Sequence, residues 1–144
     1  MASDVAGTRD AVEALRQVAS ACAEQATRSN HRRFIVTLMV ETLATNARIA
    51  GEFRKMMKRF RAFLAGLVRQ GQRDGKFRRE VDPELAAGIF AGGVMGLEIQ
   101  YYQDPGAFGL ETALERFVDH YVEGLVEKPG RGVRGDRHGR LRTE

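Results

Sequence analysis

The sequence of 144 residues contains one cysteine, three prolines, three histidines and no tryptophan. Because Cys22 stands alone, the chain can form no intramolecular disulfide and no thiolate metal cluster. No segment approaches about 18 consecutive apolar residues, and no basic leader precedes an apolar core near the N-terminus. These absences favour a protein of the reducing cytoplasm without a membrane partner.

Signatures of catalysis are equally scarce. His31, His120 and His138 are far apart, and no pair of histidines or carboxylates has the spacing of metal ligands. The sequence contains no Gly-x-Ser-x-Gly elbow, no phosphate-binding loop and no dinucleotide fingerprint. It therefore predicts that the protein is not an enzyme and has no catalytic residues, no metal and no cofactor.

Charge and composition predict one domain with two tails. Apolar residues make up 43% and charged residues 29%, which is ordinary for a globular domain of this length. The net charge is +4, but residues 129–144 hold five arginines against two acids, which leaves the rest near +1. Residues 1–128 therefore lack the clustered positive charge expected of a nucleic-acid-binding surface. We expect a flexible N-terminus over 1–8, a domain over 9–127 and a basic, disordered tail over 128–144.

Apolar residues recur every three to four positions in five segments, and no segment has the pattern of a strand. Asp82-Pro83-Glu84 is the strongest start signal, because aspartate caps a helix and proline lacks only an N–H that has no helical partner there. Thr45-Asn46 marks a break between two apolar stripes. The sequence predicts an all-α, five-helix antiparallel bundle, with helices over 9–27, 31–45, 46–73, 83–102 and 108–126.

The helix predicted over 83–102 is unusually rich in glycine, at a cost of roughly 1 kcal/mol for each one. Small residues three or four apart let another helix approach closely. That helix could belong to the same chain or to a second copy, and we favour the second copy. The predicted interface consists of Gly88, Ile89, Gly92, Gly93 and Gly96, with Leu110, Leu114, Phe117, Val118 and Tyr121 of the last helix.

Methionines and phenylalanines at helical spacing fill the middle of the chain. Such a stripe most often faces a core, but flexible methionines also suit a cavity for varied apolar ligands. A cavity needs a few polar groups to orient its ligand, and Thr42, Asn46 and Glu98 are the candidates. The predicted lining for a small hydrophobic effector consists of Leu38, Met39, Thr42, Asn46, Met56, Phe60, Phe63 and Met95. The basic run over 54–61 is predicted to be a solvated helix face rather than a surface for membrane or nucleic acid.

Two stretches taken together, GQRDGKF over 71–77 and VDPELAA over 81–87, precede the glycine-rich helix and the amphipathic last helix. This set resembles the C-terminal domain of regulators of the tetracycline-repressor (TetR) family. The resemblance covers about residues 9–126. It implies a homodimer in which helices 83–102 and 108–126 of two copies form a four-helix bundle, with the preceding helices and Met95 around a ligand cavity.

Family members begin with a helix-turn-helix domain of three helices, which residues 1–30 cannot accommodate. We therefore expect either part of a longer regulator or a separate sensing and dimerisation module. DNA would be contacted only through a helix-turn-helix domain that this sequence does not contain. An alternative is a helical protein-interaction and dimerisation module that has no small ligand.

Overall fold

The computed structural model describes residues 10–45 and 47–126. These residues form five helices and no strand, apart from an isolated bridge between Phe77 and Val126. The all-α prediction is thus confirmed, while the predicted tails over 1–8 and 128–144 lie outside the described residues. The helices are α1 (Ala11–Arg28), α2 (Asn30–Glu41), α3 (Arg48–Arg73), α4 (Pro83–Gln103) and α5 (Leu110–Leu125).

Three helices begin where a side chain caps the first turn. Asp10 accepts a hydrogen bond from the amide of Val12 at 3.0 Å, and Asp82 accepts one from Glu84 at 3.0 Å. Ser29 is both the end of α1 and the cap of α2. Each cap satisfies an amide that has no helical partner, so these helix starts follow from local sequence.

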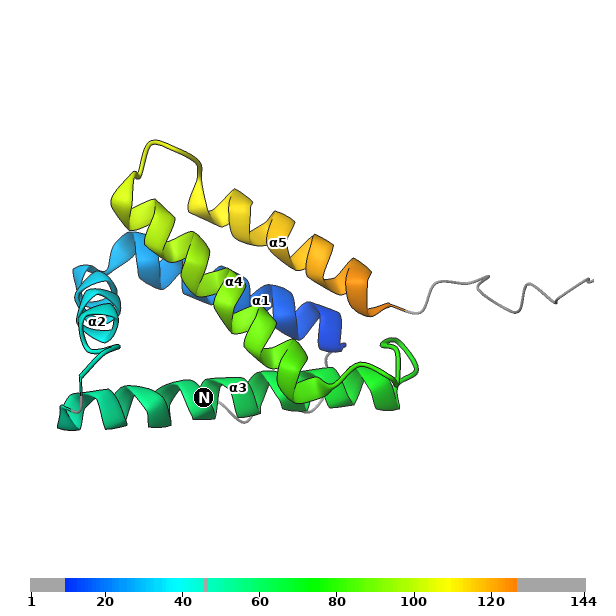
Figure 1. Cartoon of the computed structure of the whole chain (residues 1–144). Helices are drawn as coiled ribbons and strands as arrows, with labels where there is room; N and C mark the ends of the chain where they lie inside the picture. Colours follow the sequence, from blue (N-terminus) through cyan, green and yellow to red (C-terminus); the bar gives the residue numbers. More distant parts are fainter. Residues whose placement is uncertain (1–9, 46, 127–144) are drawn as a thin grey trace, which may run out of the picture.

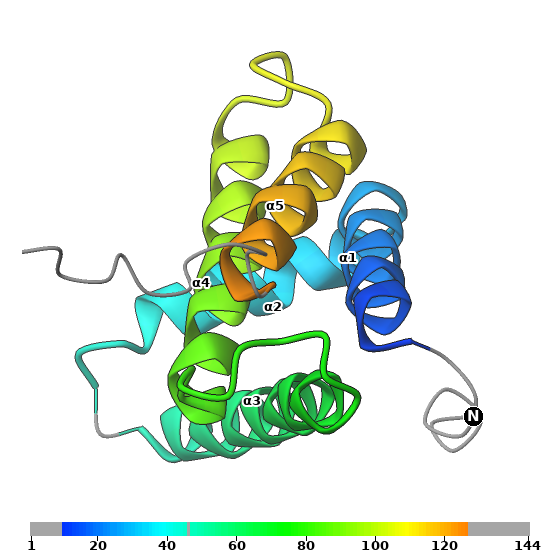
Figure 2. The same ribbon diagram turned by 90° about the vertical axis from the view of Figure 1, so that its right-hand side faces the viewer.

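Helix α1 packs against α2, α3, α4 and α5. Figures 1 and 2 show α4 and α5 as an antiparallel hairpin, with α3 crossing the end of α4 at which that helix begins. The buried side chains of α1 are mostly alanine, which lets its neighbours approach its backbone closely. The largest fully buried side chains come from all the helices except α2, together with the 74–82 loop: Leu15, Leu64, Val68, Phe77, Phe90, Val94, Glu98, Leu110, Leu114 and Val118.

The loop between α3 and α4 explains why the stretch over 71–77 has its pattern. Gly75 adopts φ 74°, a left-handed conformation that glycine tolerates. A Cβ at Gly71 would overlap the buried ring of Phe77, so glycine is needed for the ring to lie there. The side-chain amide of Gln72 donates to the carbonyls of Arg78 and Val81 at 3.0 and 2.8 Å. These contacts hold the loop against the end of α3.

The glycines of α4 do not share one role. A Cβ at Gly93 would overlap the ring of Phe117, so this glycine lets α5 pack closely within one chain. Phe117 also lies in an aromatic cluster, 5.3 Å from Phe90 and 5.8 Å from Tyr121 between ring centroids. No atom lies within 4 Å of a Cβ built at Gly92 or Gly96. Among the glycines of α4, Gly92 and Gly96 are therefore the two with open space beside them.

The predicted interface needs a correction on α5. Leu110, Leu114 and Val118 are at most 2% exposed, on a helix that packs against α1. They belong to the core of one chain and cannot reach a second copy without displacing α1. The sequence correctly predicts that α5 has an apolar face. It does not predict that α1 covers this face, because α1 lies about 100 residues away in the chain and periodicity reports only on neighbouring residues.

Candidate ligand-binding site

A cavity of about 320 Å³ opens between α1, α2, α3 and α4; we call it the inner cavity. Its volume is at the lower end of the range for small-molecule sites. Most of its wall is apolar, and the polar groups are few. It is lined by Val18, Ala21, Cys22, Gln25, Arg32, Ile35, Val36, Met39, Met56, Met57, Phe60, Val94 and Met95.

A second cavity of about 470 Å³ lies beside it, between α2 and α3. We call it the outer cavity. Met39 and Met57 line both spaces, so they form the boundary between the two. The outer cavity is lined by Met39, Thr42, Leu43, Ala50, Phe53, Arg54, Met57, Lys58 and Arg61.

The structure brings half of the predicted lining together. Met39, Met56, Phe60 and Met95 line the inner cavity, whereas Thr42 lines the outer one. Leu38 and Phe63 line neither of these spaces, and Phe63 is 44% exposed on the outside of α3. Their place in a ligand site therefore remains a prediction, which neither of these two cavities supports. Asn46 lies outside the described residues.

Sequence reasoning missed the wall that α1 contributes. Val18, Ala21, Cys22 and Gln25 face the inner cavity from this helix. Their spacing of three and four puts them on one face of α1, but periodicity alone does not show whether such a face borders a cavity or a filled core. Arg32 was missed as well, since its partner lies 66 residues away.

Arg32 is the one charged residue that lines the inner cavity, and it pairs with the buried Glu98 of α4. Arg32 donates from Nε and Nη2 to the two carboxylate oxygens of Glu98, at 3.2 and 2.9 Å. The Glu98 side chain is fully buried and that of Arg32 is 27% exposed. Two parallel hydrogen bonds fix the guanidinium in orientation as well as position. The pair leaves little net charge at this end of the cavity.

Other groups near the pair are held in their neutral forms. Burial, reinforced by the charge of Glu98, raises the pKa of the Cys22 thiol to about 11. Burial also raises the pKa of Tyr102, whose hydroxyl has no hydrogen-bond partner of good geometry among the described residues. Burial lowers the pKa of Arg32, but the hydrogen bonds and charge of Glu98 outweigh it and the net shift is upward. The lining of the inner cavity therefore contains one cation, which is paired with a buried carboxylate, and otherwise uncharged side chains.

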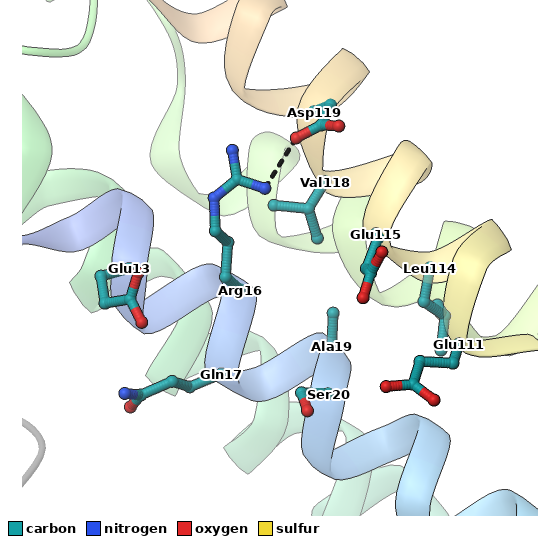
Figure 3. A pocket seen from close by; sticks show the side chains of 10 residues that line it. All are labelled: Glu13, Arg16, Gln17, Ala19, Ser20, Glu111, Leu114, Glu115, Val118 and Asp119. Atoms are coloured by element: carbon teal, nitrogen blue, oxygen red, sulfur yellow. Dashed lines mark hydrogen bonds and ion pairs between the residues drawn. The ribbon is translucent and has the colours of Figure 1, made fainter.

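A third cavity, of about 390 Å³, lies between α1 and α5 and has a different character. Figure 3 shows Arg16 reaching from α1 to Asp119 on α5, with Glu111 and Glu115 along the same helix. The Arg16 to Asp119 ion pair spans 2.6 Å, and five of the ten lining residues are charged. No group of histidine, cysteine and carboxylate side chains suited to a metal occurs within the described residues. This space is a poor match for an apolar ligand.

An apolar strip runs along the outside of α4. Leu85 and Ile89 are 64% and 56% exposed, and Gly92 and Gly96 continue the strip at helical spacing. Large exposed apolar side chains in a row usually mark an interaction surface. Ile89, Gly92 and Gly96 therefore remain available for a second copy, as does the partly exposed Tyr121; Gly88 lies near the side chain of Arg61. Within the described part of the chain, no helix is long and apolar enough to cross a membrane.

The described domain thus has five helices, four of which surround an apolar cavity, and an exposed glycine-containing strip. Residues 11–127 match the family model described as the C-terminal domain of BetI-type transcriptional repressors. The chain belongs to the TetR family of transcriptional regulators, as the resemblance predicted. None of the curated proteins matches the sequence significantly.

Solved structures of TetR-type regulators share the fold. FadR from Bacillus subtilis in complex with stearoyl-CoA is 20% identical, with a TM-score of 0.70 over 86% of this chain and 66% of that one. A TetR regulator from Chloroflexus aurantiacus is also 20% identical, with a TM-score of 0.66 over 85% and 61%. AibR, in complex with isovaleryl coenzyme A and operator DNA, is 22% identical, with a TM-score of 0.64 over 83% and 63%. The chain thus spans about three fifths of the length of these structures.

Proposed function

We propose that this chain is the effector-binding and dimerisation domain of a cytoplasmic TetR-type regulator, and that its effector is a small, largely apolar molecule. The observation that carries the proposal is the inner cavity. Its wall is largely apolar, comes from four helices, and contains one cation, Arg32, which is already paired with Glu98. Two structural relatives contain acyl-coenzyme A ligands, so an acyl chain is a reasonable first class to test.

The cavity suggests how a ligand changes the domain. Helix α2 buries only Val36 and Met39 among its twelve residues, and both line the inner cavity. A ligand that contacts these two side chains together with Met56 and Met95 adds apolar contacts between α2 and the rest of the bundle. It therefore favours the arrangement in which α2 lies close. In a complete regulator, that shift would alter the spacing of two DNA-binding heads.

Ligand binding is tested by thermal shift and titration with neutral apolar compounds. Met56→Trp fills the inner cavity and should lower affinity at least tenfold. The matched control is Phe63→Trp, because Phe63 lies on the same helix, is exposed and lines neither cavity. If no apolar compound raises the melting temperature of the unmodified chain, the sensor proposal fails and the dimerisation module without a ligand is preferred.

Dimerisation is tested independently of the ligand. Gly92→Leu places a bulky side chain on the exposed strip, where the single chain has open space. We expect the variant to keep its helical circular-dichroism signal and to become monomeric in light scattering. Glu115→Leu, in the cavity between α1 and α5 and not on the α4 strip, is the matched control for an added apolar side chain. A chain that is monomeric at high micromolar concentration before any substitution would contradict this part of the proposal.

A further inference from the structure

The outer cavity combines an apolar floor with a row of positive charge. Arg54, Lys58 and Arg61 line it from α3, at spacings of four and three that put them on one side of the helix. No carboxylate belongs to its lining. A cleft lined by charge of one sign concentrates ions of the opposite sign.

These three cations have no acidic partner within residues 10–45 and 47–126. Lys55, next to Arg54 on the same helix, pairs with Glu52 at 3.1 Å, whereas Arg54, Lys58 and Arg61 form no ion pair there. A solvated helix face, which is the interpretation favoured from sequence alone, would not require the cations to border a cavity. Their position beside a cavity, and the absence of a carboxylate in its wall, indicate a place for an external anion.

The basic outer cavity and the inner cavity share two flexible side chains. Met39 and Met57 line both. Methionine is unbranched and rotates easily, so a ligand longer than one cavity can displace these side chains and extend into the other. The inner end is different, because the guanidinium of Arg32 is already paired with Glu98. An anionic group is therefore better stabilised in the outer cavity than in the inner one.

We propose that the outer cavity binds the phosphate-bearing head of an amphipathic effector whose apolar chain lies in the inner cavity. This inference rests on the proposed function, because it assigns the second end of the same ligand. Three cations exceed what one carboxylate can use, whereas a phosphate dianion offers three oxygens that accept charge-assisted hydrogen bonds. A coenzyme A thioester and a simple alkyl phosphate monoester both carry this chemistry.

The test compares ligands that have one chain and different heads. Isothermal titration is carried out with decanol, decyl phosphate and decanoyl-coenzyme A at low ionic strength. We expect decyl phosphate to bind at least tenfold more tightly than decanol, and the advantage to shrink as salt is added. If decanoyl-coenzyme A binds more tightly than decyl phosphate, the head group is coenzyme A. If decyl phosphate binds more tightly, the head group is a simple phosphate monoester.

Variants separate the head from the chain. Arg54→Ala and Lys58→Ala should each weaken decyl phosphate roughly tenfold, the equivalent of one charge-assisted hydrogen bond. Neither should change decanol binding more than twofold. Arg59→Ala is the matched control, because Arg59 is an exposed cation next to Lys58 that lines neither cavity. Circular dichroism confirms that each variant is folded.

The outcomes distinguish this inference from the function on which it rests. If decanol and decyl phosphate bind equally well, or if Arg54→Ala behaves like Arg59→Ala, the anionic head is refuted while the apolar sensor stands. If Met56→Trp abolishes binding of every ligand and the cation variants affect only the phosphate, both are supported. If neither decanol nor decyl phosphate binds the unmodified chain, both are refuted.

Discussion

Arg32→Met removes the cation that pairs with the fully buried carboxylate of Glu98. Two hydrogen bonds, at 2.9 and 3.2 Å, are lost from an acidic group that water does not reach. Removing one partner of a buried pair costs about 3–5 kcal/mol, because the remaining charge is uncompensated. For a domain of this size, that loss corresponds to a decrease in melting temperature of roughly 10–20 °C.

Replacing the carboxylate instead, in Glu98→Leu, should lower the free energy of unfolding by less. In Glu98→Leu the guanidinium of Arg32 remains, but its side chain is 27% exposed and can turn toward water. We expect a loss of about 1–2 kcal/mol, mainly from the hydrogen bonds. The double variant replaces both charges with apolar groups of similar size and should come within about 1 kcal/mol of the unmodified chain.

The assay is urea unfolding followed by far-ultraviolet circular dichroism, with the unmodified chain and the three variants at one protein concentration. A fixed concentration is needed because dimerisation would contribute to the measured free energy of unfolding. Two results would refute the reasoning. One is a loss below about 1 kcal/mol for Arg32→Met. The other is a double variant as unstable as Arg32→Met, which would show that the guanidinium stabilises the fold through contacts other than Glu98.

Three further predictions concern packing and access. Gly93→Ala should destabilise the fold by about 1–3 kcal/mol, because its Cβ would overlap the ring of Phe117, whereas Gly66→Ala in open space should stabilise it by up to about 1 kcal/mol; chemical denaturation measures both. Leu114→Ala should cost about 2–5 kcal/mol in the same assay, since the side chain is 1% exposed; a loss of dimer without loss of stability would restore the interface role predicted from sequence. The thiol of Cys22 stays protonated well above neutral pH because its pKa is raised to about 11, two units above the ordinary value, so at about pH 8 iodoacetamide should alkylate the native chain roughly a hundredfold more slowly than the urea-unfolded chain. A ligand in the inner cavity should slow this labelling further, and labelling at the unfolded rate would show that the thiol is not buried.

Four of the thirteen residues that line the inner cavity could be predicted from the sequence, because Met39, Met56, Phe60 and Met95 lie on the apolar stripes of α2, α3 and α4. The rest could not. Cys22 comes from a helix that periodicity describes correctly but cannot orient, and Arg32 finds its carboxylate on α4, 66 residues further along the chain. A polar residue on an amphipathic helix looks solvent-exposed until the helix that covers it is known.

The sequence by itself determined the five helices and where most of them begin. Caps such as Asp82 and turn residues such as Gly75 act on neighbours a few positions away, so their effects can be predicted from the sequence. The tertiary structure alone decided which apolar faces meet. It placed Leu114 against α1 and Gly93 against Phe117, and it left Gly92 open to a second copy. The physical reason is that an apolar stripe specifies that it will be buried, but its partner is selected by shape and distance once all five helices pack together.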